Sequence, residues 1–146
     1  MRQINNFTED KNLKQTLREN VQWALLDFNN AFGLVAINQK VFIDDQWEII
    51  DLLLYHVLLK CYVIVNIQDQ ELKQGDTDQI NQHLAYLQDH KIPGDRDPIA
   101  LIICKSHNKI DVYYSAGKDR DDIFVAEYKT KLPSEEDIKK KLKKLK

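Results

Sequence analysis

The stretch IIDLLLYHVLLKCYVIVNIQ, residues 49–68, holds more apolar and β-branched sequence than any other part of the chain. It predicts two buried strands, residues 48–55 and 61–67, which are joined by a turn across residues 56–60. Nearly continuous apolar runs are typical of strands that are covered on both faces. We therefore expect a sheet with helices packed on it.

Three polar residues interrupt this apolar pattern. They are Asp51 in the first strand, and Asn66 and Gln68 at the end of the second. Residues two apart on a strand share a face, so Asn66 and Gln68 should lie side by side. A buried carboxylate without a partner is costly, so Asp51 needs a hydrogen-bond donor, a metal ion or an exposed strand end.

The hairpin resembles the nuclease domain of the bacterial YhcG-like family, which has a PD-(D/E)XK, restriction-endonuclease-like fold. The first strand of that family reads Ile-Asp-Leu-Leu-x-Tyr-His, and residues 50–56 match it. Residues 79–81 are similar to the start of its Gln-Leu-Asn-x-Tyr motif, and residues 101–106 to its Ile-Ile-Leu-Cys-Lys-Ser strand. The resemblance covers about residues 13–136 and implies an α/β sandwich with a mixed central sheet flanked by helices.

The resemblance also implies a divalent-metal site, in which the family's Asp and Glu hold the ion and its Lys orients or activates water. Asp51 stands at the Asp position, whereas Asn66 and Gln68 replace the Glu and the Lys. The first change removes a negative charge from a site for a doubly charged ion, and Gln68 cannot supply a cation. Gln79 and Glu19 complete the candidate set, although a solvated helical Glu is the simpler interpretation of Glu19.

Two functions are open. The favoured hypothesis is a degenerate nuclease-fold domain that is not an enzyme, needs no cofactor, and binds DNA or a protein partner, a second copy included. The alternative is an active Mg²⁺- or Mn²⁺-dependent DNA endonuclease with a rearranged site, in which Asp51 is a metal ligand and Glu48 or Glu71 bends inward. For Asp51 itself, a structural acid bonded to the backbone or to Gln68 is weighed against a residual metal ligand.

The size and composition indicate one globular domain, residues 1–146, because 43% of the 146 residues are hydrophobic and 30% are charged. No run of 18 apolar residues predicts a membrane span, and residues 1–14 lack the apolar core of a signal peptide. The expected location is the cytoplasm. Cys61 and Cys104 lie in apolar strand-like sequence, so we expect reduced, buried thiols.

The charge is unevenly distributed. Residues 139–146 hold six of the 21 basic groups and no acid, which leaves 15 basic against 23 acidic groups, a formal charge of −8. An acidic body is a poor footprint for DNA, so a nucleic-acid role must rely on a local patch. The lysines are either a solvated helix face or a contact for nucleic acid or an acidic partner, through Lys139, Lys140, Lys143 and Lys144.

The remaining periodicity predicts the elements around the hairpin. Helices are expected at residues 8–29, 77–90 and a basic 134–146, with Thr8, Thr77 and Ser134 as their N-caps. Strands are expected at residues 32–37, 40–43, 99–104, 109–114 and 123–128, with a turn at Asn38 and Gln39 between the first two.

Overall fold

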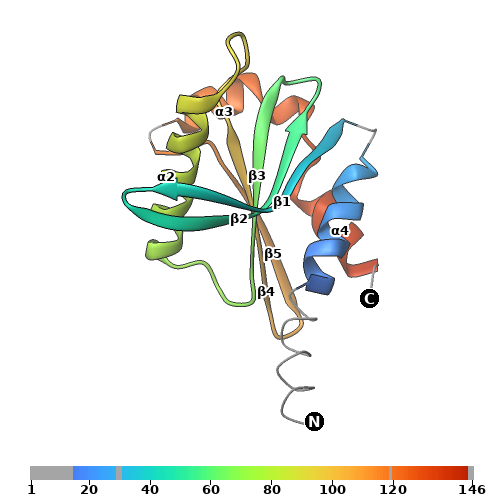
Figure 1. Cartoon of the computed structure of the whole chain (residues 1–146). Coiled ribbons are helices and arrows are strands. Elements are labelled where there is room, and N and C mark those ends of the chain that lie inside the picture. Colours follow the sequence, from blue (N-terminus) through green and yellow to red (C-terminus); the bar gives the residue numbers. More distant parts are fainter. Residues whose placement is uncertain (1–14, 29–30, 119, 145–146) are drawn as a thin grey trace.

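The computed structural model describes residues 15–28, 31–118 and 120–144. It contains a five-stranded sheet in the order β1-β2-β3-β4-β5 (Figure 1). Neighbouring strands are antiparallel except for β3 and β4, which are parallel. The strands are β1 (Phe32–Ile43), β2 (Gln46–His56), β3 (Cys61–Gln68), β4 (Ile99–Ser106) and β5 (Lys109–Ser115).

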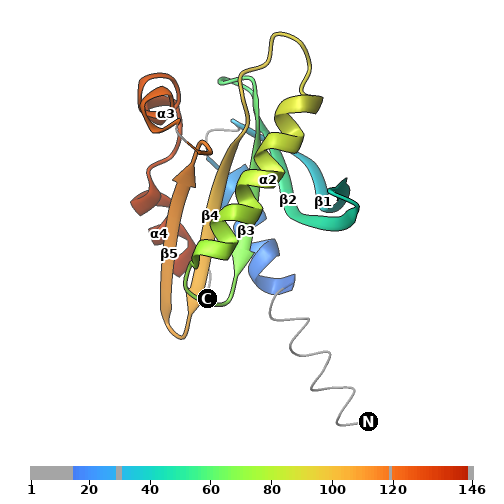
Figure 2. The same ribbon diagram turned by 90° about the vertical axis from the view of Figure 1, so that its left-hand side faces the viewer.

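Helices cover both faces of this sheet (Figure 2). One cluster of buried side chains joins the sheet to α2 (Gln74–His90). A second cluster, on the other face, joins it to the N-terminal helix (residues 15–26), α3 (Asp121–Glu127) and α4 (Glu135–Lys144). The predicted α/β sandwich with a mixed, helix-flanked sheet is therefore confirmed. No helix in the described part of the chain is long and apolar enough to cross a bilayer.

The predicted central hairpin is present as β2 and β3, with Leu54 opposite Val63. Successive residues of β3 alternate between the two clusters: Val63 and Val65 face the N-terminal helix, and Ile64 faces α2. All three are at most 1% exposed. Burial on both faces explains why this stretch has almost no polar positions.

The predicted turn at Asn38 and Gln39 is wrong, because β1 is one strand that pairs with β2 along most of its length. Asn38 adopts a left-handed conformation (φ 51°), which Asn tolerates better than most residues. The chain instead reverses at Asp44 and Asp45, both with positive φ, as in a tight hairpin turn. The polar pair at 38–39 thus marks a distortion within a strand.

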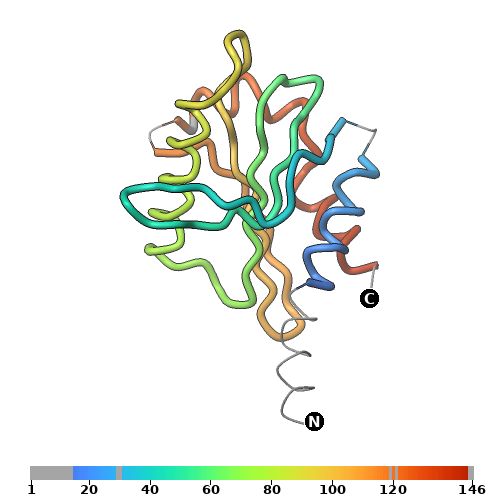
Figure 3. Tube along the Cα trace, viewed as in Figure 1, coloured from blue at the N-terminus to red at the C-terminus, as the bar shows by residue number. Residues whose placement is uncertain are grey.

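The sheet bends at this distortion. Ile50 packs in the α2 cluster, but Leu52, two residues on, packs in the opposite one, so the alternation of β2 breaks at Asp51. Beyond the bend, the ends of β1 and β2 form an arm (residues 39–50) that crosses over α2 (Figure 3). Val41 and Ile50 attach the arm to that helix.

Helix α2 begins earlier than predicted, at Gln74 rather than at Thr77. The Asp76 carboxylate accepts a hydrogen bond from the backbone N–H of Lys73 at 3.0 Å, so an acid inside the first turn secures the start. Thr77 lies within the helix, where its hydroxyl contacts the Lys73 carbonyl at 3.5 Å. The predicted inward stripe of Ile80, Leu84 and Leu87 is buried as expected.

The predicted last strand, residues 123–128, is wrong, because residues 121–127 form α3. Phe124 and Tyr128 are one helical turn apart, are both buried, and stack with ring centroids 5.9 Å apart. Ile123 and Val125 are left 41% and 59% exposed. A short run of apolar residues fits either period, and here the helical period decides which side chains are buried.

The terminal helices agree with the sequence pattern where they are described. Ser134 caps α4, since its hydroxyl oxygen accepts the backbone N–H of Asp137 at 3.0 Å. Ile138 and Leu142 are buried. In the N-terminal helix, Val21 and Leu25 are fully buried. The predicted cap at Thr8 and the inward Leu145 lie outside the described residues.

Candidate functional site

Asp51 lies at the bend, where β2 separates from β3. The last pair of these strands at that end is Leu52 with Val65. One step further, Oδ2 of Asp51 accepts a hydrogen bond from the backbone N–H of Ile67 at 3.1 Å. The half-buried Asp51 carboxylate thus supplies an acceptor for the β3 backbone at a point where the backbone of β2 no longer pairs with it. This partner of Asp51 is a backbone amide.

Asn66 and Gln68 lie on either side of Ile67 and share the α2 face of the sheet. They pair with Ile102 and Cys104 of β4, both of which belong to the α2 cluster. Oδ1 of Asn66 is buried and has no hydrogen-bond partner among the described residues. A buried acceptor of this kind is uncommon and costs free energy. The structure therefore brings the three predicted positions together around one backbone amide.

Gln68 is engaged with the start of α2. Its Nε2 donates to Oδ2 of Asp76 and to the carbonyl oxygen of Gln70, both at 3.3 Å. The Cys104 thiol lies on the same side: burial raises its pKa, and a hydrogen bond with Gln68 opposes that change. Gln68 thus places a neutral amide, bonded to a carboxylate and to a carbonyl oxygen, where the family resemblance implies a cation.

Gln79 binds Glu48 on the arm rather than any of the three positions. Its Nε2 donates to Oε1 of Glu48 at 3.0 Å, and Nε2 of His83 lies 2.8 Å from the same oxygen. These hydrogen bonds, from Gln79 first and then from His83, lower the pKa of Glu48 although burial opposes them. The three side chains hold the arm against α2.

The remaining predicted residues lie elsewhere. Glu19 is exposed on the N-terminal helix, on the opposite face of the sheet to Asn66 and Gln68, and it accepts a local hydrogen bond from Gln15 at 3.1 Å. The four predicted lysines of α4 lie on that same side of the sheet. Lys139 is half-buried, and the other three are exposed: Lys140, Lys143 and Lys144.

Comparison with known proteins assigns the family. The model of the YhcG PDDEXK nuclease domain matches residues 1–143. The chain belongs to this nuclease-domain family. It is also 27% identical over 127 residues to a protein of Escherichia coli (strain K12) that is named "Putative nuclease YhcG". That match covers 86% of this chain but 34% of the relative, so the chain spans about a third of the relative's length.

The side chains at the three positions do not fit the divalent ion that the PD-(D/E)XK family implies. They supply one carboxylate and two neutral amides, whereas hard cations such as Mg²⁺ prefer several charged oxygen ligands. Oδ2 of Asp51 already faces an N–H donor. Within residues 15–28, 31–118 and 120–144, no group of three His, Cys, Asp or Glu side chains could hold a metal. Glu48, a candidate replacement ligand, is instead bonded to Gln79 and His83.

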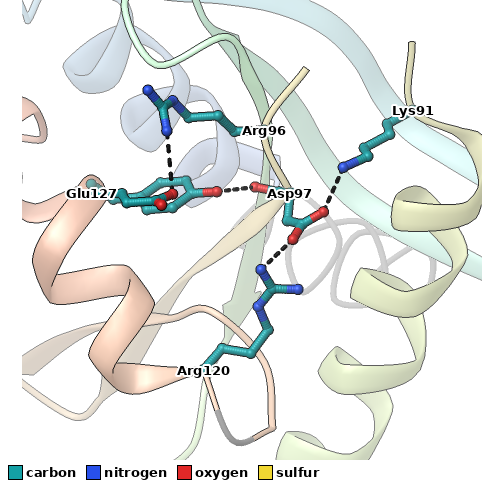
Figure 4. Close-up of polar contacts among 6 residues, drawn as sticks. Lys91, Arg96, Asp97, Arg120 and Glu127 are labelled. Carbon is teal, nitrogen blue, oxygen red and sulfur yellow. Dashed lines mark hydrogen bonds and ion pairs between the residues drawn. The ribbon is translucent and has the colours of Figure 1, made fainter. Parts of the chain in front are cut away.

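A second polar cluster lies at the start of β4 (Figure 4). The carboxylate of Asp97 accepts hydrogen bonds from Nζ of Lys91 at 2.6 Å and from the guanidinium of Arg120. Its backbone carbonyl accepts from the Tyr128 hydroxyl at 2.9 Å, and Arg96 pairs with Glu127 at 3.2 Å. Burial would raise the pKa of Asp97, but the bonds from Lys91 and Arg120 together lower it. We call these six residues the Asp97 clamp, because they tie α3 to the sheet.

Both the Glu48 contacts and the Asp97 clamp were missed by sequence reasoning. A signal for the first was available, since Gln79 and His83 are four residues apart and so share a helix face. Nothing local marked the clamp, because Asp97 and Arg120 are brought together only when residues 121–127 are recognised as a helix. Sequence patterns locate elements, whereas the partners of a charge depend on how those elements pack.

Proposed function

We propose that this PDDEXK nuclease-family domain has lost hydrolysis and acts by binding nucleic acid or a protein partner. One observation carries the proposal: the carboxylate of Asp51 accepts the amide of Ile67, while the positions on either side of that amide are Asn66 and Gln68. Phosphodiester hydrolysis with a divalent ion requires charged ligands for the ion and stabilisation of the developing negative charge. One carboxylate and two amides provide neither a second anionic ligand nor a cation.

The lysine face of α4 supports nucleic acid as one partner of this domain. Binding through the acidic remainder of the chain would be opposed electrostatically, so any contact with phosphates would be confined to this helix. The charge of that remainder equally favours a protein partner with a basic surface. Both thiols are buried and free, which supports the cytoplasm as the place of action.

One observation favours the alternative, an active metal-dependent DNA endonuclease with a rearranged site. Oδ1 of Asn66, which has no hydrogen-bond partner in the described part of the chain, is an oxygen atom that lies next to the amide bonded to Asp51. A cation held by this oxygen and by Asp51 would need further ligands from water or from DNA phosphates. Activity by this route would depend on the Asp51 carboxylate.

Incubation of supercoiled plasmid with the protein and either Mg²⁺ or Mn²⁺ tests both functions. We expect no cleavage above that of a metal-free reaction, and no difference between the protein and Asp51→Ala. Cleavage that is abolished by Asp51→Ala, but kept by Asp89→Ala, a control at an exposed helical acid, would overturn the proposal. In Asn66→Glu/Gln68→Lys, calorimetry should detect Mn²⁺ binding, whereas Gln68→Lys alone should bind no better than the parent.

The binding role is tested by the salt dependence of affinity for a DNA duplex. Replacing the four named α4 lysines by Gln should weaken binding and make the slope of log K against log salt shallower, by up to about 0.9 for each phosphate that the variant no longer neutralises. The matched control removes the same charge elsewhere, at four exposed lysines: Lys40, Lys73, Lys109 and Lys118. Equal effects of the two variants would reject a local DNA interface and leave a protein as the partner.

A further inference from the structure

The end of the arm carries two large apolar side chains on its outer side. Phe42 and Trp47 are cross-strand partners with ring centroids 5.1 Å apart, and they are 50% and 70% exposed. Val41 packs in the α2 cluster, so its neighbour Phe42 points away from α2. Exposed aromatic pairs of this kind are typical of the centre of protein interfaces. We call Phe42, Trp47 and the turn residues Asp44 and Asp45 the tip.

The opposite side of the molecule has a hollow that could receive such a group. It lies between the N-terminal helix and α4, has a volume of about 380 Å³, and is lined by Trp23, Ala24, Leu26, Asp27 and Lys141. Trp23 is 65% exposed. Nζ of Lys141 pairs with Asp27 at 2.7 Å and lies 4.5 Å from the centre of the Phe28 ring. The hollow therefore combines an apolar floor with the Lys141–Asp27 ion pair at its rim.

The charges around the two surfaces are complementary. Asp44 and Asp45 are exposed beside the aromatic pair of the tip. Beyond the Lys141–Asp27 ion pair at the rim of the hollow, α4 carries further exposed lysines, Lys140 and Lys144 among them. Two tips in contact would bring four carboxylates together, which is unfavourable, whereas a tip in a hollow brings opposite charges together. Charge therefore favours one occupant of the hollow over self-pairing of tips.

We infer that the hollow binds the tip of a second copy of this chain. The arm's turn and the two helices lie at opposite sides of the molecule (Figure 1). The contact is therefore heterologous, since one copy contributes its tip and the other its hollow. The first copy keeps a free hollow and the second a free tip, so further copies can add. Two aromatic side chains bury at most about 150–250 Å² each, which is below the ~800 Å² per partner of a standard interface. The association is weak and grows with protein concentration.

Sedimentation equilibrium of the full chain over a wide concentration range tests this contact. The average mass of the parent should rise with concentration. A tip variant, Phe42→Ser/Trp47→Ser, and a hollow variant, Trp23→Ser, should each stay monomeric. An equimolar mixture of the two variants should form a dimer and nothing larger, because it contains one intact tip and one intact hollow per pair. Val125→Ser, at an equally exposed position on α3, should behave as the parent.

The charges give an independent measurement. Asp44→Asn/Asp45→Asn keeps residues that tolerate positive φ but removes both carboxylates. It should weaken association about two- to tenfold, and added salt should reduce this difference. A parent that is monomeric at all concentrations, a tip variant that still associates, or a mixture of variants that stays monomeric would each overturn the inference. Circular dichroism of each variant establishes that the fold is retained.

Discussion

Two aspartates of this protein, one just before a strand and one within a strand, differ in what surrounds their carboxylates. Asp97 precedes β4 and is held by two cationic side chains, Lys91 and Arg120. Asp51 lies on β2 and accepts a hydrogen bond from a backbone amide. The first carboxylate has its charge balanced by protein cations, whereas the second stands at the position where the family resemblance implies a metal ion.

The difference separates the backbone of the candidate site from its side chains. The bend at Asp51, the left-handed Asn38 on the neighbouring strand and the arm over α2 are features of the backbone. The ionic ligands around that backbone are absent from positions 66 and 68. A carboxylate that also satisfies a backbone amide has a structural role that does not depend on the metal. An acid is therefore useful at position 51 even in the domain without hydrolysis that we propose.

Removing the carboxylate of the clamp is expected to have the largest effect on stability. Asp97→Ala leaves Lys91 and Arg120 without their acceptor while both are half-buried, at 29% and 24% exposure. The free energy of unfolding should fall by about 2–3 kcal/mol in urea denaturation. Glu127→Ala, which breaks the exposed pair with Arg96 in the same clamp, should cost less than about 1 kcal/mol. Equal costs would show that the Asp97 contacts are no stronger than surface pairs.

At Asp51 the expected loss is smaller. Asp51→Ala removes the acceptor of the Ile67 amide and should lower the free energy of unfolding by about 1–2 kcal/mol. Asp51→Asn keeps an acceptor oxygen, so it should cost less than the alanine variant in the same urea titration. The sign of the change in the free energy of unfolding distinguishes a structural acid from a residual metal ligand at position 51. A carboxylate kept for an ion at the expense of stability would give a more stable protein when it is replaced.

The sequence predicted the central hairpin, α2, the β4–β5 pair and α4. In each of them the spacing of the apolar residues and the capping or turn residues at the ends indicate the same structure. It failed at residues 38–39 and 123–128, where two structures fit the same local pattern. Asn38 and Gln39 have the composition of a turn, but pairing with β2 continues through them. Phe124 and Tyr128 become buried together only in a helix packed beside β5, which is a tertiary effect.

The candidate site was predictable in position but not in its bonding. Position 51 and positions 66 and 68 could be grouped from strand alternation and from the family motif. The amide that Asp51 accepts belongs to Ile67, an apolar residue that no motif would select. Glu48 was a candidate metal ligand in the sequence, but the bend directs it to Gln79 and His83. Local sequence does not specify that bend.

A buried histidine, which is neutral in the folded protein, extends the comparison of the two aspartates. His56 is fully buried, and its Nδ1 accepts the backbone N–H of Leu59 at 3.1 Å, so the folded protein requires the neutral ring. Burial lowers the pKa of His56 below its ordinary value of 6.5, although the backbone of Lys131 opposes this. The unfolded chain therefore binds a proton before the folded one does. Stability should be complete above about pH 6.5 and fall as the pH decreases from there towards the lower pKa of the folded state.

His56→Asn should remove that dependence while keeping an acceptor for Leu59. Between pH 7.5 and pH 5, the melting temperature should fall less steeply for the variant than for the parent. In free energy of unfolding, the two slopes should differ by at most about 1.4 kcal/mol per pH unit. His107→Asn, at an exposed turn position with φ 56°, is the matched control and should follow the parent. The effect is smaller than at Asp97 because it is confined to acidic conditions. If the two Asn variants have the same pH profile, His56 does not contribute to acid sensitivity, and the titrating carboxylates alone would account for it.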